Sequence, residues 1–270
     1  MSRISAAFEA RQRQGQTTLV VYLVGGDQHP EWTVPLMHAM VEAGADVIEL
    51  GVPFTDPEAE GPVIQEGHDR ALKHGITLTD MLARVQDFRA DNSNTPVVLM
   101  GYINPIEAMG YERFADRAKA AGVDGTIMVN LPPEEGETME ALLKARDMDP
   151  VYLLAPTTTS ERATFICSRS SGFVYYVSLK GVTGAGHLDT AQVAERVAGF
   201  RASTDLPIAV GFGIKDGASA AAVASVADGV VVGSALVQRI AEADNLEAAC
   251  DTTAALVRQI RLAIDEQIKN

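Results

Sequence analysis

Short apolar runs rich in valine, isoleucine, leucine and tyrosine recur along the chain, between longer segments whose hydrophobic positions have a helical repeat. The runs are almost continuously apolar rather than alternating, which is typical of parallel strands covered on both faces. A strand plus a crossover helix needs roughly 20 to 35 residues, and every interval but one fits this length. The eight predicted strands are 18–24, 46–50, 96–101, 125–129, 150–154, 173–178, 207–211 and 229–232.

This alternation of strands and helices predicts the fold class. Eight units without a proline- or serine-rich linker favour a single (β/α)8 TIM barrel domain over residues 1–270. A doubly wound open sheet has similar local units and is the alternative, although eight strands in 270 residues favour closure. An apolar stripe from Leu246 to Ile264 predicts a long C-terminal helix, and Thr158 followed by Glu161 has the spacing of a capping box.

Composition narrows the classes of function. The chain has 36 acidic and 22 basic residues and a net charge of −14, so its surface repels nucleic-acid phosphates and anionic membranes. We therefore expect no nucleic-acid partner and no membrane partner. Cys167 and Cys250 match no metal-site spacing and no disulfide framework, and the sequence shows neither a signal peptide nor a run of ~18 apolar residues. These features predict a cytoplasmic protein.

A lone carboxylate lies in the second predicted strand. The strand period of two puts Val47, Glu49 and Gly51 on one face and Ile48 and Leu50 on the other. If the second set faces the helices, Glu49 points into the barrel near its catalytic mouth, where loss of water raises its pKa and suits it to acid/base work. The alternative is a glutamate neutralised by a basic side chain, but few strand residues here are basic.

The loop that follows, residues 52–62, adds Asp56, Glu58 and Glu60 and no basic residue. Three chemistries fit: paired acid/base carboxylates, a site for Mg²⁺ or Ca²⁺, or a solvated acidic loop. Prolines stiffen the segment, which suits a positioned loop. A metal site usually draws carboxylates from later strand ends as well, whereas Tyr102 and Asn130 stand there, so the metal interpretation is the weaker one.

Glycine-rich turns follow the last three predicted strands. Gly213 and Gly233 lie after strands seven and eight, where barrels commonly bind phosphate through exposed backbone N–H groups, and Ser234 adds a hydroxyl. Tyr175 shares a face of strand six with Phe173. If that face is inward, Tyr175 either orients a substrate beside the carboxylate or is a core tyrosine, and the pattern does not separate the two.

Five segments resemble one known family, in the same order along nearly the whole chain. They read ELGVPFTDP at 49–57, GYINP at 101–105, YVSLKGVTG at 176–184, VGFGI at 210–214 and VGS at 232–234. They are similar to segments of the tryptophan synthase alpha chain family, and the first and third are the most specific. The resemblance implies a (β/α)8 barrel with an extra N-terminal helix, which would be residues 3–14.

The resemblance also implies an activity, namely retro-aldol cleavage of indole-3-glycerol phosphate to indole and glyceraldehyde 3-phosphate. This is a lyase reaction of tryptophan biosynthesis. The alpha chain itself would use no cofactor and no metal. Pyridoxal phosphate belongs to the beta-chain partner, which receives the indole through a tunnel within an alpha2beta2 tetramer.

The resemblance also implies a role for individual residues of this chain, assigned by their positions in the matching segments. Glu49 would be the acid/base glutamate, and Glu60 would stand for the family's second catalytic carboxylate. The substrate-binding residues would be Tyr22, Tyr175, Thr183, Gly184, Gly213, Gly233 and Ser234. Gly184, Gly213, Gly233 and Ser234 would hold the phosphate, and Thr183 and Gly184 would lie on the loop after strand six.

Three places depart from the family pattern, and one is VGGD at 24–27, where the family usually has Thr-Ala-Gly-Asp. The family's second carboxylate is usually an aspartate in Ala-Asp-Gly-Pro, whereas this chain has Glu60 between Ala59 and Gly61, and Asn130 stands where an aspartate is expected. A misplacement on the order of 1 Å can cost ~10²-fold in rate. An alternative function is therefore a catalytically weakened alpha chain that binds ligand and regulates the beta chain. Another phosphate-binding barrel enzyme is disfavoured by the long matches.

Overall fold

The computed structural model describes residues 2–178, 190–211 and 213–267. These residues form nine strands in one parallel sheet, in the order β5-β4-β3-β2-β1-β9-β8-β7-β6. The two ends of this order, β5 and β6, are separated in sequence only by Tyr152, so the sheet closes through the chain itself. The strands are β1 (Thr18–Val24), β2 (Val47–Gly51), β3 (Val97–Gly101), β4 (Gly125–Met128), β5 (Asp149–Val151), β6 (Leu153–Leu154), β7 (Val174–Val177), β8 (Ile208–Gly211) and β9 (Gly229–Val232).

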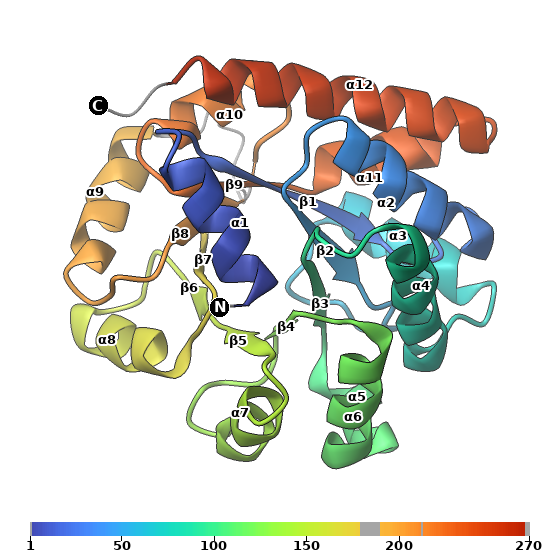
Figure 1. Cartoon of the computed structure of the whole chain (residues 1–270), viewed down its shortest axis with the longest axis horizontal. Helices are drawn as coiled ribbons and strands as arrows, with labels where there is room; N and C mark the ends of the chain where they lie inside the picture. The colour runs from blue at the N-terminus through green and yellow to red at the C-terminus, as the bar shows by residue number, and fades with distance from the viewer. Residues whose placement is uncertain (1, 179–189, 212, 268–270) are drawn as a thin grey trace.

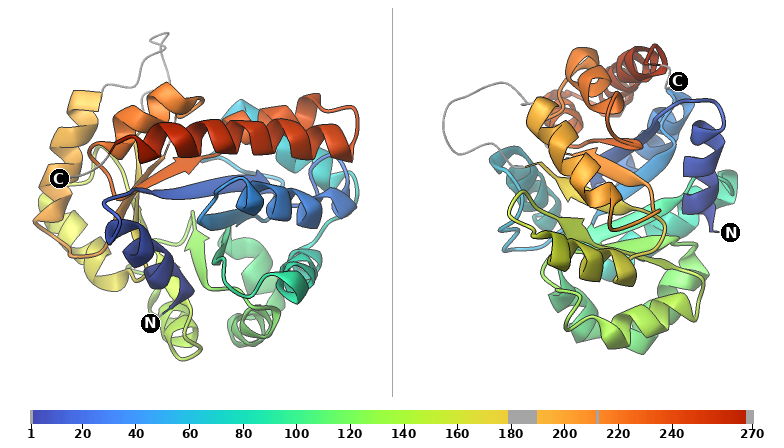
Figure 2. Two further views of the ribbon diagram at one scale, coloured as in Figure 1. Left: turned by 45° about the horizontal axis from the view of Figure 1, so that its top comes forward. Right: turned by 90° about the vertical axis from the view of Figure 1, so that its left-hand side faces the viewer.

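Helices surround this ring of strands (Figure 1). They are α1 (Arg3–Gln12), η1 (Pro30–Trp32), α2 (Thr33–Glu42), α3 (Pro62–Leu72), α4 (Leu78–Asp91), α5 (Ile103–Met109), α6 (Tyr111–Ala121), α7 (Glu137–Lys144), α8 (Ser160–Arg169), α9 (Thr190–Arg201), α10 (Gly217–Ala224), α11 (Ser234–Glu242) and α12 (Leu246–Asp265). The long interval between β2 and β3 holds both α3 and α4. The expected C-terminal helix is α12, which packs against α2, α10 and α11 (Figure 2). The predicted TIM barrel is confirmed.

The strand alternation separates two apolar layers. Val47 packs inside the barrel, whereas Ile48 and Leu50 belong to the layer between strands and helices. Likewise Tyr175 faces inward and Tyr176 outward. Ile48 and Leu50 thus face the helices, which was the condition for an inward Glu49, and Tyr175 lies on the inward face of its own strand.

Helix α1 is the extra N-terminal helix, and it covers the amino-terminal end of the barrel in front of the strands (Figure 1). Ile4 and Phe8 join the apolar cluster inside the barrel, and the Phe8 ring lies 5.3 Å from that of Phe173. Arg3 and Arg11 extend from the same helix to acidic residues at the strand starts. The helix ends two residues earlier than the expected residue 14.

Aspartates stand directly before three strands at this end of the barrel. Asp46, Asp124 and Asp228 each accept the backbone N–H of the first or second residue of the neighbouring strand, in every case at 2.8 Å. Each also pairs with arginine. The Asp46 carboxylate contacts Arg11 of α1 at 2.7 Å and Arg261 of α12 at 2.9 Å, which joins the first helix to the last.

Asp124 and Asp228 have arginine partners as well. Asp124 pairs with Arg3 at 2.8 Å and with Arg89 at 2.6 Å, and Asp228 pairs with Arg201. All of these acidic groups therefore combine a backbone hydrogen bond with an ion pair.

Two local expectations are wrong in detail. The fifth predicted strand is divided at Tyr152, because its first part pairs with β4 and its second with β7. The helix after it is capped by Thr159 rather than Thr158. Thr159 has an extended backbone and accepts the N–H of Arg162, whereas the Thr158 hydroxyl accepts the N–H of Ala155. Within the described ranges no helix is both long and apolar enough to span a bilayer.

Candidate active site

A cavity of about 650 Å³ opens at the carboxyl ends of the strands. Aliphatic side chains make up much of its wall. Of the residues expected to form the site, the cavity is lined by Tyr22, Glu49, Glu60, Tyr175, Gly213, Gly233 and Ser234. The structure thus brings together seven expected residues, from strands β1, β2 and β7 and from the segments that follow β2, β8 and β9. Thr183 and Gly184 lie outside the described residues.

Glu49 is the most deeply buried carboxylate of the cavity, with 1% of its surface exposed. Its Oε2 atom has no hydrogen-bond partner, and no ion pair to Glu49 occurs within the described ranges. Burial, and then the nearby charge of Glu60, raises the pKa of Glu49 to about 8. The neutralising basic partner considered as an alternative is therefore not found there. A carboxyl group of this kind holds a proton near neutral pH and can still release it.

Glu60 is the second buried carboxylate, on the loop after β2. The Tyr102 hydroxyl donates to its Oε2, while the backbone N–H of Ala59 donates to the Tyr102 hydroxyl at 3.1 Å. Burial raises the pKa of Glu60 to about 7, although the Tyr102 hydrogen bond opposes this shift. Glu58 and Asp56 are exposed, so this loop combines one buried carboxylate with two solvated ones.

The loop that carries Glu60 is held in place by its neighbours. Phe54 stacks on Tyr102 with ring centroids 4.9 Å apart, and the Phe54 N–H donates to Nδ1 of His68 at 3.1 Å. The Gln65 side-chain amide donates to the Glu60 carbonyl at 2.9 Å. The sequence did not point to Tyr102 or His68 as site residues, although Tyr102 lies in one of the resembling segments.

Two tyrosine hydroxyls reach the cavity over glycines. A Cβ atom on Gly51 would lie 2.3 Å from the Tyr22 hydroxyl oxygen, and one on Gly211 would lie 2.3 Å from that of Tyr175. Any larger residue at either glycine would displace its tyrosine. Burial is the largest cause that raises the pKa of both tyrosines well above the usual value, so both hydroxyls keep their protons.

The opposite side of the cavity is suited to an anion. Gly213 has φ of +78°, and helix α11 begins at Ser234 directly after Gly233. No side chain caps this helix, so its first N–H groups are available where they meet the cavity. The nearest side-chain atoms to a Cβ built on Gly233 are two Tyr22 carbons at 3.5 Å.

Asn130, which follows β4, is held by hydrogen bonds to the segment after β3. Asn130 accepts the Ile103 N–H at 2.8 Å and donates to Asn104 at 3.1 Å, so it caps the start of α5. Among the residues that the structure describes, no group of three or more histidine, cysteine, aspartate or glutamate side chains is arranged to hold a metal ion.

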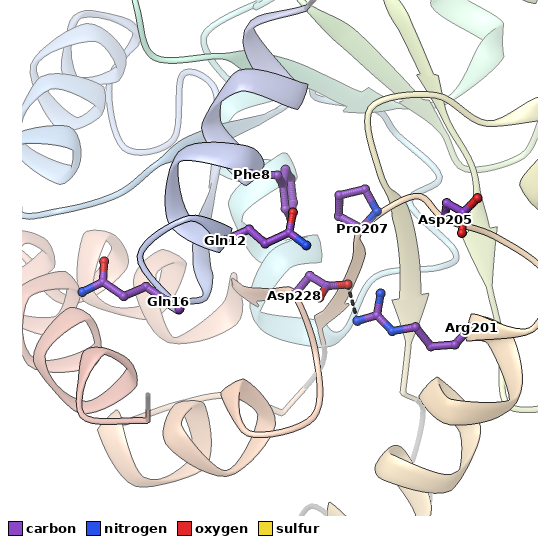
Figure 3. Close-up of a pocket in the computed structure, with 8 residues that line it drawn as sticks. Phe8, Gln12, Gln16, Arg201, Asp205, Pro207 and Asp228 are labelled. Atoms are coloured by element: carbon purple, nitrogen blue, oxygen red, sulfur yellow. Dashed lines mark ion pairs between the residues drawn. The ribbon is translucent and has the colours of Figure 1, made fainter. Parts of the chain in front are cut away.

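A second cavity, of about 250 Å³, lies at the amino-terminal end of the barrel beside α1 (Figure 3). Phe8 and Pro207 form its apolar part. Its charged pair, Arg201 and Asp228, is joined by an ion pair across the cavity wall (Figure 3). Unlike Glu49, the Asp228 carboxylate accepts a backbone N–H, that of Ile208, and also has an arginine partner.

Comparisons with known proteins agree on one family. The family model described as "Tryptophan synthase alpha chain" matches residues 8–265. The tryptophan synthase alpha chain of Thioalkalivibrio sulfidiphilus is 55% identical over 266 residues, covering 98% of this chain and 100% of the relative. That of Marinobacter nauticus is 57% identical over 241 residues, or 89% of each chain. A crystal structure of tryptophan synthase subunit alpha from Legionella pneumophila has a TM-score of 0.91 at 45% identity, covering 98% of this chain and 99% of that one.

Proposed function

The chain belongs to the tryptophan synthase alpha chain family, and on this premise we propose that it cleaves indole-3-glycerol phosphate to indole and glyceraldehyde 3-phosphate. This retro-aldol reaction makes it a lyase of tryptophan biosynthesis. The observation that carries the proposal is the pair of buried carboxylates, Glu49 and Glu60, in one cavity that also meets a helix N-terminus without a side-chain cap.

In the proposed mechanism Glu49 moves the proton. A protonated Glu49 delivers its proton to C3 of the indole ring, which leaves the ring positively charged. The ionised Glu49 then takes the proton of the hydroxyl on the attached carbon as the carbon–carbon bond breaks, its electrons return to the ring, and the aldehyde forms. The raised pKa of about 8 supports this role, because the group starts protonated near neutral pH.

Glu60 is proposed to accept a hydrogen bond from the indole N–H. Its negative charge would favour the cationic ring, and a preorganised charge in a water-poor site acts more strongly than in water. Tyr102 supports this role, since its hydroxyl fixes one carboxylate oxygen and leaves the other for the substrate. The longer glutamate side chain thus has a partner that sets its position.

The phosphate would bind on the opposite side, at Gly213, Gly233 and Ser234. The N–H groups at the start of α11 and the Ser234 hydroxyl supply donors for its oxygens. Thr183 and Gly184 would complete this part of the site. The N-terminus of α10, by contrast, is already capped by Asp216.

We further propose that the chain works with a beta-chain partner in an alpha2beta2 tetramer. The family membership supports a beta-chain partner, to which indole would pass. The alpha chain would need no cofactor of its own, and pyridoxal phosphate would belong to the partner. A cytoplasmic location is consistent with Cys167 and Cys250 being free thiols.

A steady-state assay of indole release tests the proposal. The isolated chain is expected to release indole, and a beta chain is expected to accelerate it. Ser234→Asp should abolish binding of glycerol phosphate in calorimetry by placing like charge against the phosphate, whereas Ser234→Ala should cost only ~0.5–3 kcal/mol. Negligible release together with intact phosphate binding would instead support a regulatory subunit, and equal affinity in Ser234→Asp would exclude this phosphate site.

A further inference from the structure

Tyr22 and His68 form a buried pair at the edge of the cavity. The Tyr22 hydroxyl lies 3.4 Å from Nε2 of His68, which belongs to α3 and has 1% of its surface exposed. The other ring nitrogen, Nδ1, accepts the backbone N–H of Phe54. Because that backbone group can only donate, Nδ1 carries no proton, so the neutral imidazole carries its proton on Nε2. His68 therefore donates to the Tyr22 oxygen.

The charges around the pair keep both groups neutral. Burial lowers the pKa of His68 to about 4, opposed only by Asp69 on its own helix. Tyr22 is faced by Glu49 from β2, Glu60 from the following loop, Tyr102 after β3 and Tyr175 from β7. These groups and burial keep its phenol protonated. The Tyr22 hydroxyl thus receives one hydrogen bond and keeps a hydrogen of its own.

That hydrogen has no acceptor within the part of the chain that the structure describes, where His68 is the hydroxyl's one hydrogen-bond partner. Tyr22 nevertheless lines the cavity. A buried O–H donor without an acceptor is costly, which favours an acceptor supplied by a ligand.

The Tyr22 ring connects the two halves of the site. Its Cβ and Cδ1 atoms lie beside Gly233, where the phosphate is proposed to bind, and its hydroxyl lies over Gly51, one inward position beyond Glu49. A ligand that joins the phosphate to the carbon served by Glu49 must pass along this ring. In the proposed substrate that connecting part is the glycerol chain, whose hydroxyl oxygens accept hydrogen bonds.

Resting on the proposed function, we propose that Tyr22 donates a hydrogen bond to a glycerol hydroxyl oxygen of the substrate, and that His68 is the positioning residue that holds the phenol for this contact. His68 links the phenol on β1 to the loop that carries Glu60, through Phe54. The pair would therefore select ligands that carry a hydroxyl over otherwise similar ligands that lack one.

Calorimetric binding with two probes tests this, in a Glu49→Gln background that stops turnover. One probe is indole-3-glycerol phosphate, and the other is indole-3-propyl phosphate, which lacks both hydroxyls. Tyr22→Phe is expected to weaken binding of the first probe about tenfold and of the second less than about twofold, as loss of one hydrogen bond predicts. Thermal unfolding of each variant checks that the fold is retained.

Two substitutions of His68 separate positioning from packing. His68→Asn keeps an acceptor near Nδ1 for the Phe54 N–H but has no donor near Nε2, and it should lose about three- to tenfold affinity for the hydroxyl probe alone. His68→Gln places an amide N–H near Nε2 and should restore binding to within about twofold. Adding His68→Asn to Tyr22→Phe should cause no further loss, because His68 acts through the hydroxyl.

The outcomes are distinguishable from failure of the proposed function. Equal losses for both probes, or a further loss when His68→Asn is added to Tyr22→Phe, would overturn the inference and leave the lyase proposal standing. If the parent protein binds neither probe, the proposed function fails and the inference with it.

Discussion

At the amino-terminal end of the barrel, Asp46, Asp124 and Asp228 each accept a backbone N–H and pair with arginine. At the carboxyl-terminal end, Glu49 has neither kind of partner within the described ranges, and Glu60 accepts from a neutral tyrosine. The two ends meet on β2, where Asp46 directly precedes the strand and Glu49 lies within it, and both side chains have little exposure. They differ in what surrounds the charge.

The difference shows how partners decide what burial does to a carboxylate. Burial raises the pKa of both Asp46 and Glu49. For Asp46 the Leu19 N–H and the guanidinium groups of Arg11 and Arg261 oppose the shift, whereas no lowering cause acts on Glu49. A partnered charge ties elements together, and an unpartnered one exchanges its proton near neutral pH. The barrel thus separates a structural end from a chemical end.

Glu49→Gln should have the largest effect, because glutamine keeps the shape but cannot carry the proton. We expect kcat for indole release to fall by about 10²–10⁴-fold while the protein stays folded. Asp124→Asn is the matched control, a buried carboxylate at the other end, and should leave kcat within about twofold. Near-parental turnover in Glu49→Gln would refute its acid/base role.

Asp46→Asn should give the largest loss of stability. The amide leaves Arg11 without a countercharge and Arg261 with Asp265 alone, at a site that joins the first and last helices, and we expect the free energy of unfolding to fall by about 2–4 kcal/mol. Urea denaturation measures this. Glu9→Gln, which breaks the exposed pair with Arg13, should cost less than about 0.5 kcal/mol. Equal costs at the two sites would contradict the contrast between buried and exposed pairs.

The pH dependence of the free energy of unfolding should also show that Glu49, unlike the partnered aspartates, lacks a partner for its charge among the described residues. The folded-state pKa of Glu49, about 8, exceeds its ordinary value of 4.5, so the folded protein binds the extra proton between these values. The stabilisation is complete below about pH 4.5 and is lost as pH rises through 8. Relative to the parent, Glu49→Gln should therefore gain about 4 kcal/mol of stability between pH 5 and pH 9.

Thermal unfolding of the parent and of Glu49→Gln between pH 5 and pH 9 measures the difference in their stability. Glu60 contributes to the pH dependence of both proteins, so the difference reports on Glu49. A gap that stays constant from pH 5 to pH 9 would mean that the Glu49 pKa is not raised.

Tyr102→Phe should have the smallest effect of the four. It removes the hydroxyl that positions Glu60, and we expect kcat/KM for indole release to fall about tenfold, as loss of one hydrogen bond to a carboxylate predicts. Tyr111→Phe removes a similar bond, to Glu107 on the exposed surface, and should change kcat/KM by less than about twofold. No difference between the two variants would argue against a positioning role for Tyr102.

Much of the barrel could be predicted from the sequence, because covered strands are continuously apolar and their polar exceptions are visible. The period of two placed Glu49 on the inner face once Ile48 and Leu50 were taken to face the helices, whereas Tyr175 was placed in the site through the family resemblance. Gly213 and Gly233 followed from their places after late strands. The division of the fifth strand at Tyr152 was not predictable, since it depends on which neighbour each part pairs with.

The contacts that position the site could not be predicted in the same way. Tyr102 meets Glu60, and His68 meets Tyr22, across more than 40 residues, and a local pattern does not encode such pairings. The aspartates before the strands did leave a signal. Gly44 and Gly122 each precede an aspartate by two residues at the start of a strand, and this repeat marks the helix end and strand start together.

The contacts of helix α12 affect how the protein can fold while it is being synthesised. Arg261 contacts Asp46 at 2.9 Å and the Thr17 carbonyl at 3.0 Å, so a residue synthesised near the end joins residues synthesised near the beginning. Phe173 reaches Phe8 only after most of the chain has left the ribosome. Contacts between such distant residues close slowly. During most of translation the amino-terminal end of the barrel therefore lacks the contacts of Arg261 with Asp46 and Thr17. These contacts form only after α12 has emerged from the ribosome.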